Sequence, residues 1–423
     1  MELTHEEQSL LDGERGPGTA MAMRLVVRLA EAMGATELRP ISGAHIDSCL
    51  YHGQSGLDFV NVLVEGDAQV VVPTTLNVSS LDLLHPELYI GDDDTRTSAT
   101  ALMDAYIALG CEPTWTCAPY QREHRPAFGE DVAWAESNAI VFANSVLGAR
   151  THRYGDFIDI AAAVTGRVPN AGLHLEANRR ATLVFDVSEL STELLAVDAV
   201  YPMIGFVVGR EAGTQVPAIT GLPSNASEDN LKALGAAAAS SGSLAMFHAV
   251  GLTPEAPTLE VACGGAIPAS TFTVTSAMVR DARDALSKPA LSQRTSSTLT
   301  SVNLGTPHYS VSEIGLLHDE LVGRSVHPSV ALYVSTGREV LAEAGLRGWV
   351  EPLEAAGVQF VTDTCTYITP IVRDTTGVAM SDSAKWAYYA PGNIGVESIF
   401  ATLTECVESA IAGTIVRDDG LWS

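Results

Sequence analysis

The sequence predicts an α/β protein of several domains, in which parallel sheets are covered by helices. Its 423 residues correspond to two or three domains, at roughly 150 residues per domain. Hydrophobic residues make up 46% of the chain, which is enough to fill large cores. From about residue 290 onward, strand-like apolar runs alternate with amphipathic stretches. This alternation is typical of a parallel sheet with helical crossovers.

The first part of the chain predicts helices, short strands and tight turns. Residues 17–38 carry apolar side chains at helical spacing, and Gly34 is placed to end that helix. Two apolar stretches punctuated by Gly and Asp, 38–51 and 56–77, predict strands and tight turns. Further helices are expected at 95–110 and 131–148.

The remaining elements continue this pattern. Short apolar runs at 182–186 and 203–209 predict buried strands, and a stretch rich in Gly, Ala and Ser at about 210–270 predicts closely packed helices and loops. The later strand–helix pairs are expected at 298–305 with 310–321 and at 331–336 with 338–345, before a strand at 358–365. We therefore predict three regions: an N-terminal α/β region 1–210, a connecting region 211–290 and a C-terminal α/β region 291–423.

Charge and composition exclude several function classes. The chain has 24 Lys plus Arg against 51 Asp plus Glu, a formal charge of -27, which disfavours nucleic acids and anionic membrane surfaces as partners. There is no apolar run of about 20 residues and the N-terminus is acidic, so we expect a cytoplasmic protein that does not span a membrane. The six widely spaced Cys predict free thiols or metal ligands. The P-loop, the G-x-S-x-G elbow, H-E-x-x-H and C-x-x-C are all missing.

A polar block at residues 42–53 contains the first candidate site residues. If residues 44–50 form a strand, then His45, Asp47 and Cys49 share one face, because side chains alternate with period two. An imidazole, a carboxylate and a thiol together can bind a metal or transfer protons. The alternative is a solvated strand edge with one buried thiol.

Two further blocks each carry a Cys in polar surroundings. Cys117 lies between two Pro on a rigid segment, and Cys365 shares a face with Asp363 near the carboxyl end of a predicted strand, where α/β proteins bind ligands. Together with Cys49 they could hold an iron–sulfur cluster, since soft thiolates select such clusters. A structural turn at Cys117 and a packing role for Cys365 remain the alternatives. We interpret the other three thiols as structural: Cys111, Cys263 and Cys406.

Two cationic residues are candidates for binding an anion. Lys385 is one of only three Lys and lies among Ser, Trp and Tyr, although a solvated surface Lys is the alternative. Arg150 follows a predicted helix on which Glu136 and Asn144 fall on a similar face, and Arg suits bidentate binding of a carboxylate. The alternative there is a capped helix whose polar residues are satisfied.

Eight blocks in one order resemble the large subunit of the aconitase X family, over roughly residues 20–410. The blocks are GAHIDSCLYHG, VPTTLN, GCEPTWTCAPY, AWAESNAIVFANSVLGART, TGRVPNAGLHL, GTPHYS, VTDTC and DSAKWAYYAPGN. The resemblance implies an aconitase-like α/β fold and a lyase that removes water. It also implies an iron or iron–sulfur centre, with a [2Fe–2S] cluster favoured. Because the chain ends soon after the last block, the family's swivel domain is expected to be missing and to be supplied by a small partner subunit.

The resemblance is nearest to the bacterial cis-3-hydroxy-L-proline dehydratase branch. The archaeal phosphomevalonate dehydratases have a Cys where this chain has Thr306, and they lack the counterpart of Cys49. The implied iron ligands are therefore Cys49, Cys117 and Cys365.

The resemblance also implies roles for other residues. The implied catalytic residues are His45, Asp47 and Lys385, and the implied substrate-binding residues are Glu136, Asn138, Arg150 and Ser383. The small subunit could bring the base, as a Ser. Two alternatives are another hydroxy-acid dehydratase, such as one acting on a phosphorylated substrate, and a non-catalytic iron–sulfur protein. Phosphate would need more basic residues than these blocks offer, and the charge disfavours RNA.

Overall fold

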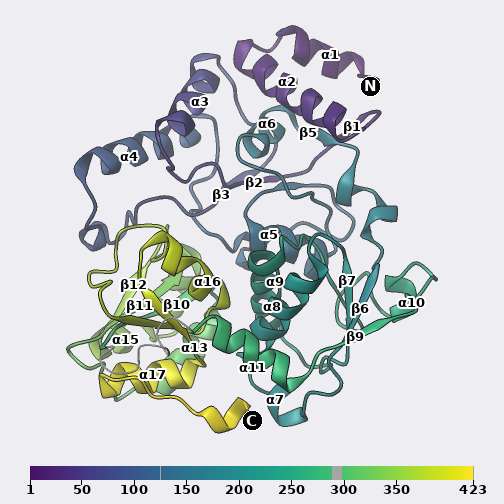
Figure 1. The fold of residues 1–423 in the computed structure, drawn as a ribbon. Coiled ribbons are helices and arrows are strands. Elements are labelled where there is room, and N and C mark those ends of the chain that lie inside the picture. Colours follow the sequence, from purple (N-terminus) through teal and green to yellow (C-terminus); the bar gives the residue numbers. More distant parts are fainter. Residues whose placement is uncertain (124, 288–297, 423) are drawn as a thin grey trace. The chain divides into compact units, whose positions relative to one another are not determined.

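The computed structural model describes residues 1–123, 125–287 and 298–422, and its contacts divide the chain into two compact units (Figure 1). The first unit contains Met1–Leu81 and Asp92–Arg180. The second contains Asp82–Gly91 and Ala181–Ser423. The ten-residue segment Asp82–Gly91 is therefore inserted in the sequence of the first unit but belongs to the second.

The first unit combines short strands with longer helices. Its helices are α1 (His5–Asp12), α2 (Pro17–Ala32), α3 (Gln54–Glu65), α4 (Asp93–Ala108), α5 (Ser137–Phe142) and α6 (Ile158–Thr165). Its strands are β1 (Leu38–Pro40), β2 (Ala44–Ile46), β3 (Thr74–Leu76), β4 (Ala133–Trp134) and β5 (Arg167–Pro169). The parallel sheet β3-β2-β4 places His45 opposite Thr75 and Trp134, while β1 and β5 form an antiparallel pair.

Two predicted helices of the first unit are confirmed, together with their stop signals. α2 and α4 are followed by Gly34 and Gly110, whose φ angles of 70° and 93° are left-handed and favour Gly. The helix predicted for 131–148 is confirmed only in its second half. It begins at Ser137 and continues as a π-helical turn (Ala143–Leu147) before the left-handed Gly148.

The strands predicted within residues 56–77 are partly wrong, because Gln54–Glu65 is the helix α3. Its buried side chains are Leu57, Val60 and Leu63, which follow one another at intervals of three. That spacing puts them on one side of a helix. The run of Val and Phe residues favoured a strand by composition, but burial of this face decided the outcome.

The second unit begins with a small parallel sheet in the order β8-β7-β6-β9. Its strands are β6 (Leu183–Asp186), β7 (Pro217–Thr220), β8 (His248–Ala249) and β9 (Thr271–Thr273). The helices of this region are α7 (Thr192–Leu195), α8 (Val200–Ala212), α9 (Glu228–Gly242), α10 (Leu259–Ala262) and α11 (Ser276–Ala285). The strand predicted at 182–186 is therefore confirmed. The stretch rich in Gly, Ala and Ser forms the predicted helices α9 and α10, but the prediction of helices and loops alone is wrong there, because β7 and β8 also lie in it.

The strand predicted at 203–209 is wrong, because these residues lie in α8. The helix is buried on nearly all sides, so its sequence lacks the polar face that marks an amphipathic helix. Two glycines let α9 approach closely. A Cβ at Gly205 would lie 2.1 Å from the carbonyl oxygen of Leu234, and one at Gly209 would lie 2.3 Å from that of Ala238.

A five-stranded parallel sheet forms the core of the C-terminal part, in the order β12-β11-β10-β13-β14. Strands β12, β11 and β10 are labelled in Figure 1. Its strands are β10 (Leu299–Tyr309), β11 (Ala331–Thr336), β12 (Val358–Val361), β13 (Val378–Ser381) and β14 (Glu397–Phe400). Its helices are α13 (Val311–Leu321), α14 (Arg338–Leu346), α15 (Val350–Ala356), α16 (Ala384–Asn393) and α17 (Leu403–Ala412). All neighbouring strands are parallel, which confirms the predicted fold class.

The two faces of this sheet have separate cores. Leu332 and Val334 pack with residues of α13, α14, α15 and α17 on one face. Tyr333, which alternates with them, packs on the other face with Leu88 of the inserted segment. The strand order reverses between β10 and β13, and α/β sheets bind ligands at the carboxyl ends of the strands beside such a reversal.

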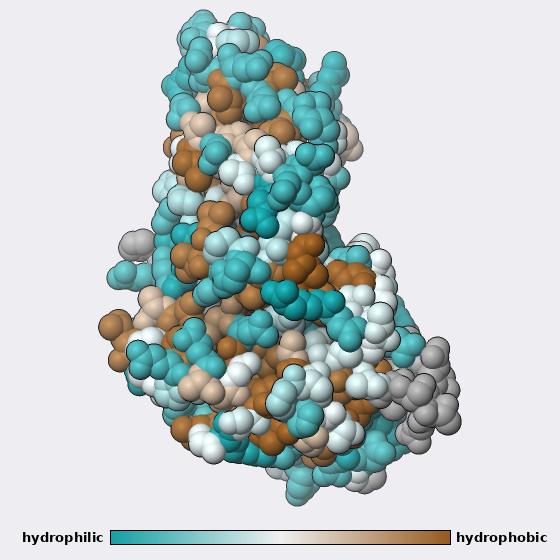
Figure 2. Space-filling view, turned by 90° about the vertical axis from the view of Figure 1, so that its left-hand side faces the viewer, coloured by the Kyte–Doolittle hydropathy of each residue, from teal (hydrophilic) through white to brown (hydrophobic). Residues whose placement is uncertain are grey.

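On the face shown in Figure 2, hydrophobic residues occur in small groups between hydrophilic ones. Among the residues that the structure describes, no helix is both long enough and apolar enough to cross a membrane.

Candidate active site

A candidate site lies at the carboxyl edge of the large sheet, in the second unit. β10 carries His308 close to its end, the turn after β12 carries Cys365, and β13 leads through Ser383 into α16 with Lys385. The strand order reverses beside β10 and β13, so these side chains lie where the topology predicts a ligand site.

His308 and Cys365 form a pair of donors that can bind a metal. Their ligand atoms lie within 4.8 Å of one another, and both side chains are buried. His308 Nε2 lies 3.1 Å from the carbonyl oxygen of Thr364 and donates to it, which leaves Nδ1 as the ring nitrogen with the lone pair. Metal-binding His residues are commonly fixed in this way by a backbone carbonyl. An imidazole and a thiolate suit iron, so the donor set fits the predicted centre.

Cys117 lies in the first unit, on an irregular segment that its neighbours hold rigidly. The preceding Trp115 has a φ of 44°, and the side-chain amide of Asn138 donates to the carbonyl oxygen of Cys117 at 3.2 Å. The Tyr120 hydroxyl in turn donates to Asn138 Oδ1 at 2.6 Å. Asn138, which the sequence assigned to substrate binding, therefore connects α5 to the backbone at Cys117.

Cys49 has different surroundings. β2 ends at Ile46, so the strand face predicted for residues 44–50 does not extend to Asp47 and Cys49, and this expectation is wrong. The Cys49 thiol donates to the carbonyl oxygens of Ile46 and Asn77, at 3.3 and 3.4 Å. Burial raises the pKa of this thiol, and nearby Asp47 raises it further. These contacts stabilise the protonated thiol, whereas a metal ligand is a thiolate.

His45 and Asp47 are both held in their neutral forms. His45 is fully buried with Nδ1 2.8 Å from the Thr75 hydroxyl, and burial together with Arg122 lowers its pKa to about 3. Burial, assisted by Glu136, raises the pKa of Asp47 to about 8. Proton-transfer groups commonly have pKa values shifted by burial and by like charges.

Glu136 is the N-cap of α5 rather than a residue on its face, because its φ is 72°. Its Oε2 accepts from the backbone nitrogens of Asn138 and Ala139, at 2.9 and 3.0 Å. The shared helix face predicted for Glu136 and Asn144 is therefore wrong. A carboxylate that caps a helix in this way stabilises the first turn.

Arg150 follows Gly148 as the sequence predicts, and it is partly exposed. Its Nη1 donates to the carbonyl oxygen of His174 at 3.3 Å, and its buried Nε has no partner among the residues that the structure describes. An arginine N–H in this state can still donate to a carboxylate oxygen of a ligand.

Lys385 is buried, with only 4% of its surface exposed, so the alternative of a solvated surface Lys is wrong. It lines a cavity of about 40 Å³ together with Lys232, Tyr309 and Asp382. The Tyr309 hydroxyl donates to Asp382, and burial raises the pKa of Asp382 to about 6. This volume has room for water.

Ser383 has a structural role at the start of α16. As the N-cap, its hydroxyl accepts from the Trp386 nitrogen at 3.0 Å and donates to the Thr306 carbonyl oxygen. Ser383 therefore connects the first turn of α16 to β10, beside His308.

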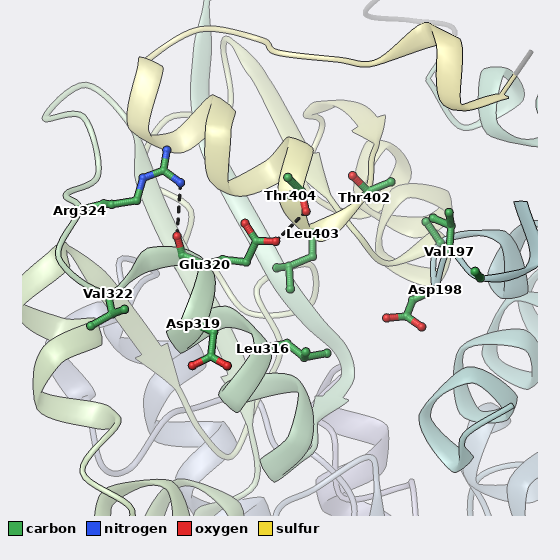
Figure 3. A pocket seen from close by; sticks show the side chains of 12 residues that line it. Val197, Asp198, Leu316, Asp319, Glu320, Val322, Arg324, Thr402, Leu403 and Thr404 are labelled. Carbon is green, nitrogen blue, oxygen red and sulfur yellow. Dashed lines mark hydrogen bonds between the residues drawn. The ribbon is translucent and has the colours of Figure 1, made fainter. Parts of the chain in front are cut away.

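A larger cavity of about 710 Å³ lies elsewhere in the second unit, and none of the predicted site residues lines it (Figure 3). Asp198, Asp319 and Glu320 give it an acidic wall. Arg324, its cationic residue, pairs with Glu408 at 2.8 Å. A substrate carboxylate would meet mainly negative charge there, so the carboxyl edge of the large sheet remains the candidate site.

Three family profiles match the chain: the aconitase X first domain at residues 1–177, the second domain at 181–284 and the third domain at 299–412. The chain belongs to the aconitase X family.

Several proteins show how similar this aconitase X is to known members. It is 43% identical over 410 residues to a cis-3-hydroxy-L-proline dehydratase of Pseudomonas aeruginosa. The matched part covers 96% of this chain and 69% of that relative. It is 36% identical over 401 residues to a phosphomevalonate dehydratase large subunit of Methanothermobacter thermautotrophicus, covering 94% of this chain and 96% of that subunit. The crystal structure of Thermococcus kodakaraensis aconitase X, holo-form, superimposes with a TM-score of 0.85 at 31% identity, covering 97% and 100% of the two chains. This aconitase X is accordingly a dehydratase, a hydro-lyase.

The sequence reasoning missed His308 as a metal-binding candidate. The residue lies in the GTPHYS block, where the resemblance singles out Thr306, because a Cys occupies that position in the archaeal pattern. A signal was present, since an imidazole two residues beyond Thr306 lies at the end of a strand that was itself predicted.

Proposed function

We propose that this aconitase X removes water from cis-3-hydroxy-L-proline. The observation that carries the proposal is the degree of similarity. Two cis-3-hydroxy-L-proline dehydratases are 43% and 38% identical over 96% and 98% of this chain, whereas the phosphomevalonate dehydratase large subunits are 31–36% identical. The reaction removes the C2 proton and the C3 hydroxyl as water, and the resulting enamine tautomerises to 1-pyrroline-2-carboxylate.

A metal centre is the second part of the proposal. His308 and Cys365 are proposed as ligands because their donor atoms are close and the tautomer of His308 is fixed. Cys117 of the first unit is proposed as a further thiolate ligand. Cys49 is the weaker candidate for that position, because its thiol donates to backbone carbonyls. Bound iron, alone or as an iron–sulfur cluster, would supply the Lewis acidity that makes hydroxide a better leaving group.

The protein's own residues have two tasks in this reaction. The first is to hold the substrate carboxylate, for which Lys385 and Arg150 are the proposed cations. The second is to support the transfer of the C2 proton to the base, for which His45 and Asp47 are the proposed groups in this chain. Hydrogen bonds to the carboxylate strengthen as negative charge develops next to C2, so they favour the transition state over bound substrate.

A small subunit is the proposed partner. The archaeal relatives are named as large subunits, and this chain matches all five over 95–100% of their length, at 31–36% identity. The bacterial and fungal relatives extend beyond the matched part, which is 69% of each. A small swivel subunit could supply the catalytic base that acts with this chain.

Phosphomevalonate dehydratase is the second candidate function, and the large subunits of similar length favour it. The two substrates differ in charge, because phosphomevalonate carries a phosphate and hydroxyproline does not. Recognition of a phosphate usually relies on converging cations or a helix N-terminus. Product formation from the two substrates, measured with the anaerobically prepared large and small subunits, decides between them. Conversion of phosphomevalonate without conversion of hydroxyproline would overturn the first candidate.

The metal proposal has its own test. We expect Cys365→Ser and His308→Ala to lose most of the bound iron and its absorption, since each removes a ligand. Cys406→Ser is the matched control, because Cys406 is also buried but lies on α17 and packs in the core on one face of the large sheet. Iron content equal to wild type in both ligand variants would show that the metal does not bind at this site.

A further inference from the structure

The turn that follows β12 is held by a buried carboxylate and a bidentate arginine. Asp363 has no exposed surface and a φ of 62°, a left-handed conformation that Asp tolerates better than most residues. Arg338, the first residue of α14, places Nε 2.5 Å from Asp363 Oδ1 and Nη2 2.7 Å from Oδ2. Such a planar pair fixes orientation as well as distance.

A second carboxylate holds the same turn from the inserted segment. Asp82 accepts from the backbone nitrogen of Thr362 at 2.7 Å and from its hydroxyl at 2.9 Å. The next residue, Leu83, donates its backbone nitrogen to Asp363 Oδ2 at 3.0 Å. The inserted segment thus holds both Thr362 and Asp363, and α14 holds Asp363 as well.

The restrained residues lead directly to both donors of the candidate metal pair. Thr364 follows Asp363 and accepts the hydrogen bond from His308 Nε2, and Cys365 comes next in the chain. A rotation of the backbone at Asp363 would therefore move the Cys365 thiol and the acceptor that fixes the His308 ring. Precise placement of donor atoms requires this kind of support.

We propose that Arg338 is a positioning residue for the metal centre, acting through Asp363 on Cys365 and His308. Its guanidinium pairs with Asp363, and it is not proposed as a ligand. The inference rests on the proposed function, because it assumes that Cys365 and His308 bind a metal. It predicts that loss of the arginine fork weakens metal binding while both ligands are still present.

Cobalt(II) binding tests this inference without measuring activity. The full chain, freed of metal, is titrated with Co²⁺, and the thiolate-to-cobalt absorption band gives both affinity and geometry. We expect Arg338→Gln to weaken Co²⁺ binding about ten- to a hundredfold, the usual effect of losing a group that supports a ligand. Arg338→Lys keeps the charge but not the fork, so it should recover little of the loss. Circular dichroism of the metal-free variants shows whether they are folded.

Arg347→Gln is the matched control. Arg347 lies at the other end of α14 and is also ion-paired, with Glu343 at 2.9 Å, but it does not touch the turn. We expect its Co²⁺ affinity and absorption band to equal those of wild type. An Arg338→Gln variant that binds Co²⁺ as tightly as wild type, with the same band, would overturn the inference. So would failure of both Arg338 variants to fold, since Arg338 would then support the fold and not the site.

Cys365→Ser separates this inference from the proposed function. If Cys365→Ser loses the band and Arg338→Gln keeps it, the metal centre stands and the positioning role is wrong. If Cys365→Ser keeps the wild-type band, the proposed metal site is wrong, and the positioning role is wrong with it.

Discussion

Lys385 is a buried cation whose removal has a measurable consequence. We expect Lys385→Met, which keeps most of the apolar stem, to lower kcat/KM about ten- to a hundredfold. An ammonium–carboxylate hydrogen bond is worth about 1.5–3 kcal/mol, and each ~1.4 kcal/mol is a factor of ten. Because the carboxylate gains charge as the proton leaves, kcat should fall together with the rise in KM.

Two observations accompany that measurement. Lys385→Arg should recover little, since a planar fork does not replace a compact ammonium group. Co²⁺ affinity should equal that of wild type, because no donor atom changes. Steady-state kinetics on hydroxyproline check the expectation, and an unchanged kcat/KM would leave Arg150 as the carboxylate anchor.

His45 makes stability depend on pH in the acid range. Its folded-state pKa of about 3 lies below the ordinary value of 6.5, so between these values the unfolded chain binds more protons. The titration of His45 therefore leaves the free energy of unfolding unchanged above pH 6.5. Between pH 6.5 and 3 it lowers this free energy by about 1.4 kcal/mol for each unit that the pH falls. We expect His45→Gln to flatten this part of the curve of thermal midpoint against pH. Parallel curves for the two proteins would show that His45 does not titrate in this way.

The contact between α8 and α9 makes a prediction at the scale of the elements. We expect Gly205→Ala to destabilise the protein by about 1–3 kcal/mol, since the new methyl group would overlap the Leu234 carbonyl and push the helices apart. Gly345→Ala on α14 is the control, because its nearest neighbour would be 3.9 Å away. That change should be neutral or slightly stabilising, as Ala favours helices by about 0.5–1 kcal/mol over Gly. Denaturant unfolding of both variants measures the difference.

The elements could be predicted from sequence only in part. Amphipathic helices and helices with clear stop signals, such as α2 and α4, were predictable, as were the strands of the large sheet. α8 was not, because burial on nearly all sides removes the polar face that reveals a helix. Gly205 and Gly209 recur at a spacing of four, which fits one side of a helix, but that spacing gains meaning only once α9 is seen to pack there.

The candidate site was predictable in part, for the same kind of reason. The carboxyl end of the strand that precedes Cys365 was predicted, and the structure puts Cys365 in the turn after it. His308 is brought close to Cys365 by the pairing of strands distant in sequence, which spacing alone does not reveal. The predicted domain boundaries remain predictions: residue 210 lies within α8, and residue 290 lies outside the described residues.

At the scale of the whole molecule, the proposed partner makes the last prediction. We expect the purified chain to show no measurable dehydration of hydroxyproline and to become active when the small subunit is added, because the base is proposed to come from that subunit. The chain should still take up Co²⁺ on its own, since the proposed ligands all lie in it. A rate for the isolated chain equal to that of the mixture would contradict the need for a partner.

The inserted segment Asp82–Gly91 also affects how the protein is made. Asp82 leaves the ribosome 280 residues before its partner Thr362, which at roughly 5–20 residues per second is an interval of about 14–56 s. During that time Leu88 has no sheet to cover, and the first unit must fold with this loop undocked. Nascent chains that stop short of β12 are therefore the species for which a chaperone would be most needed.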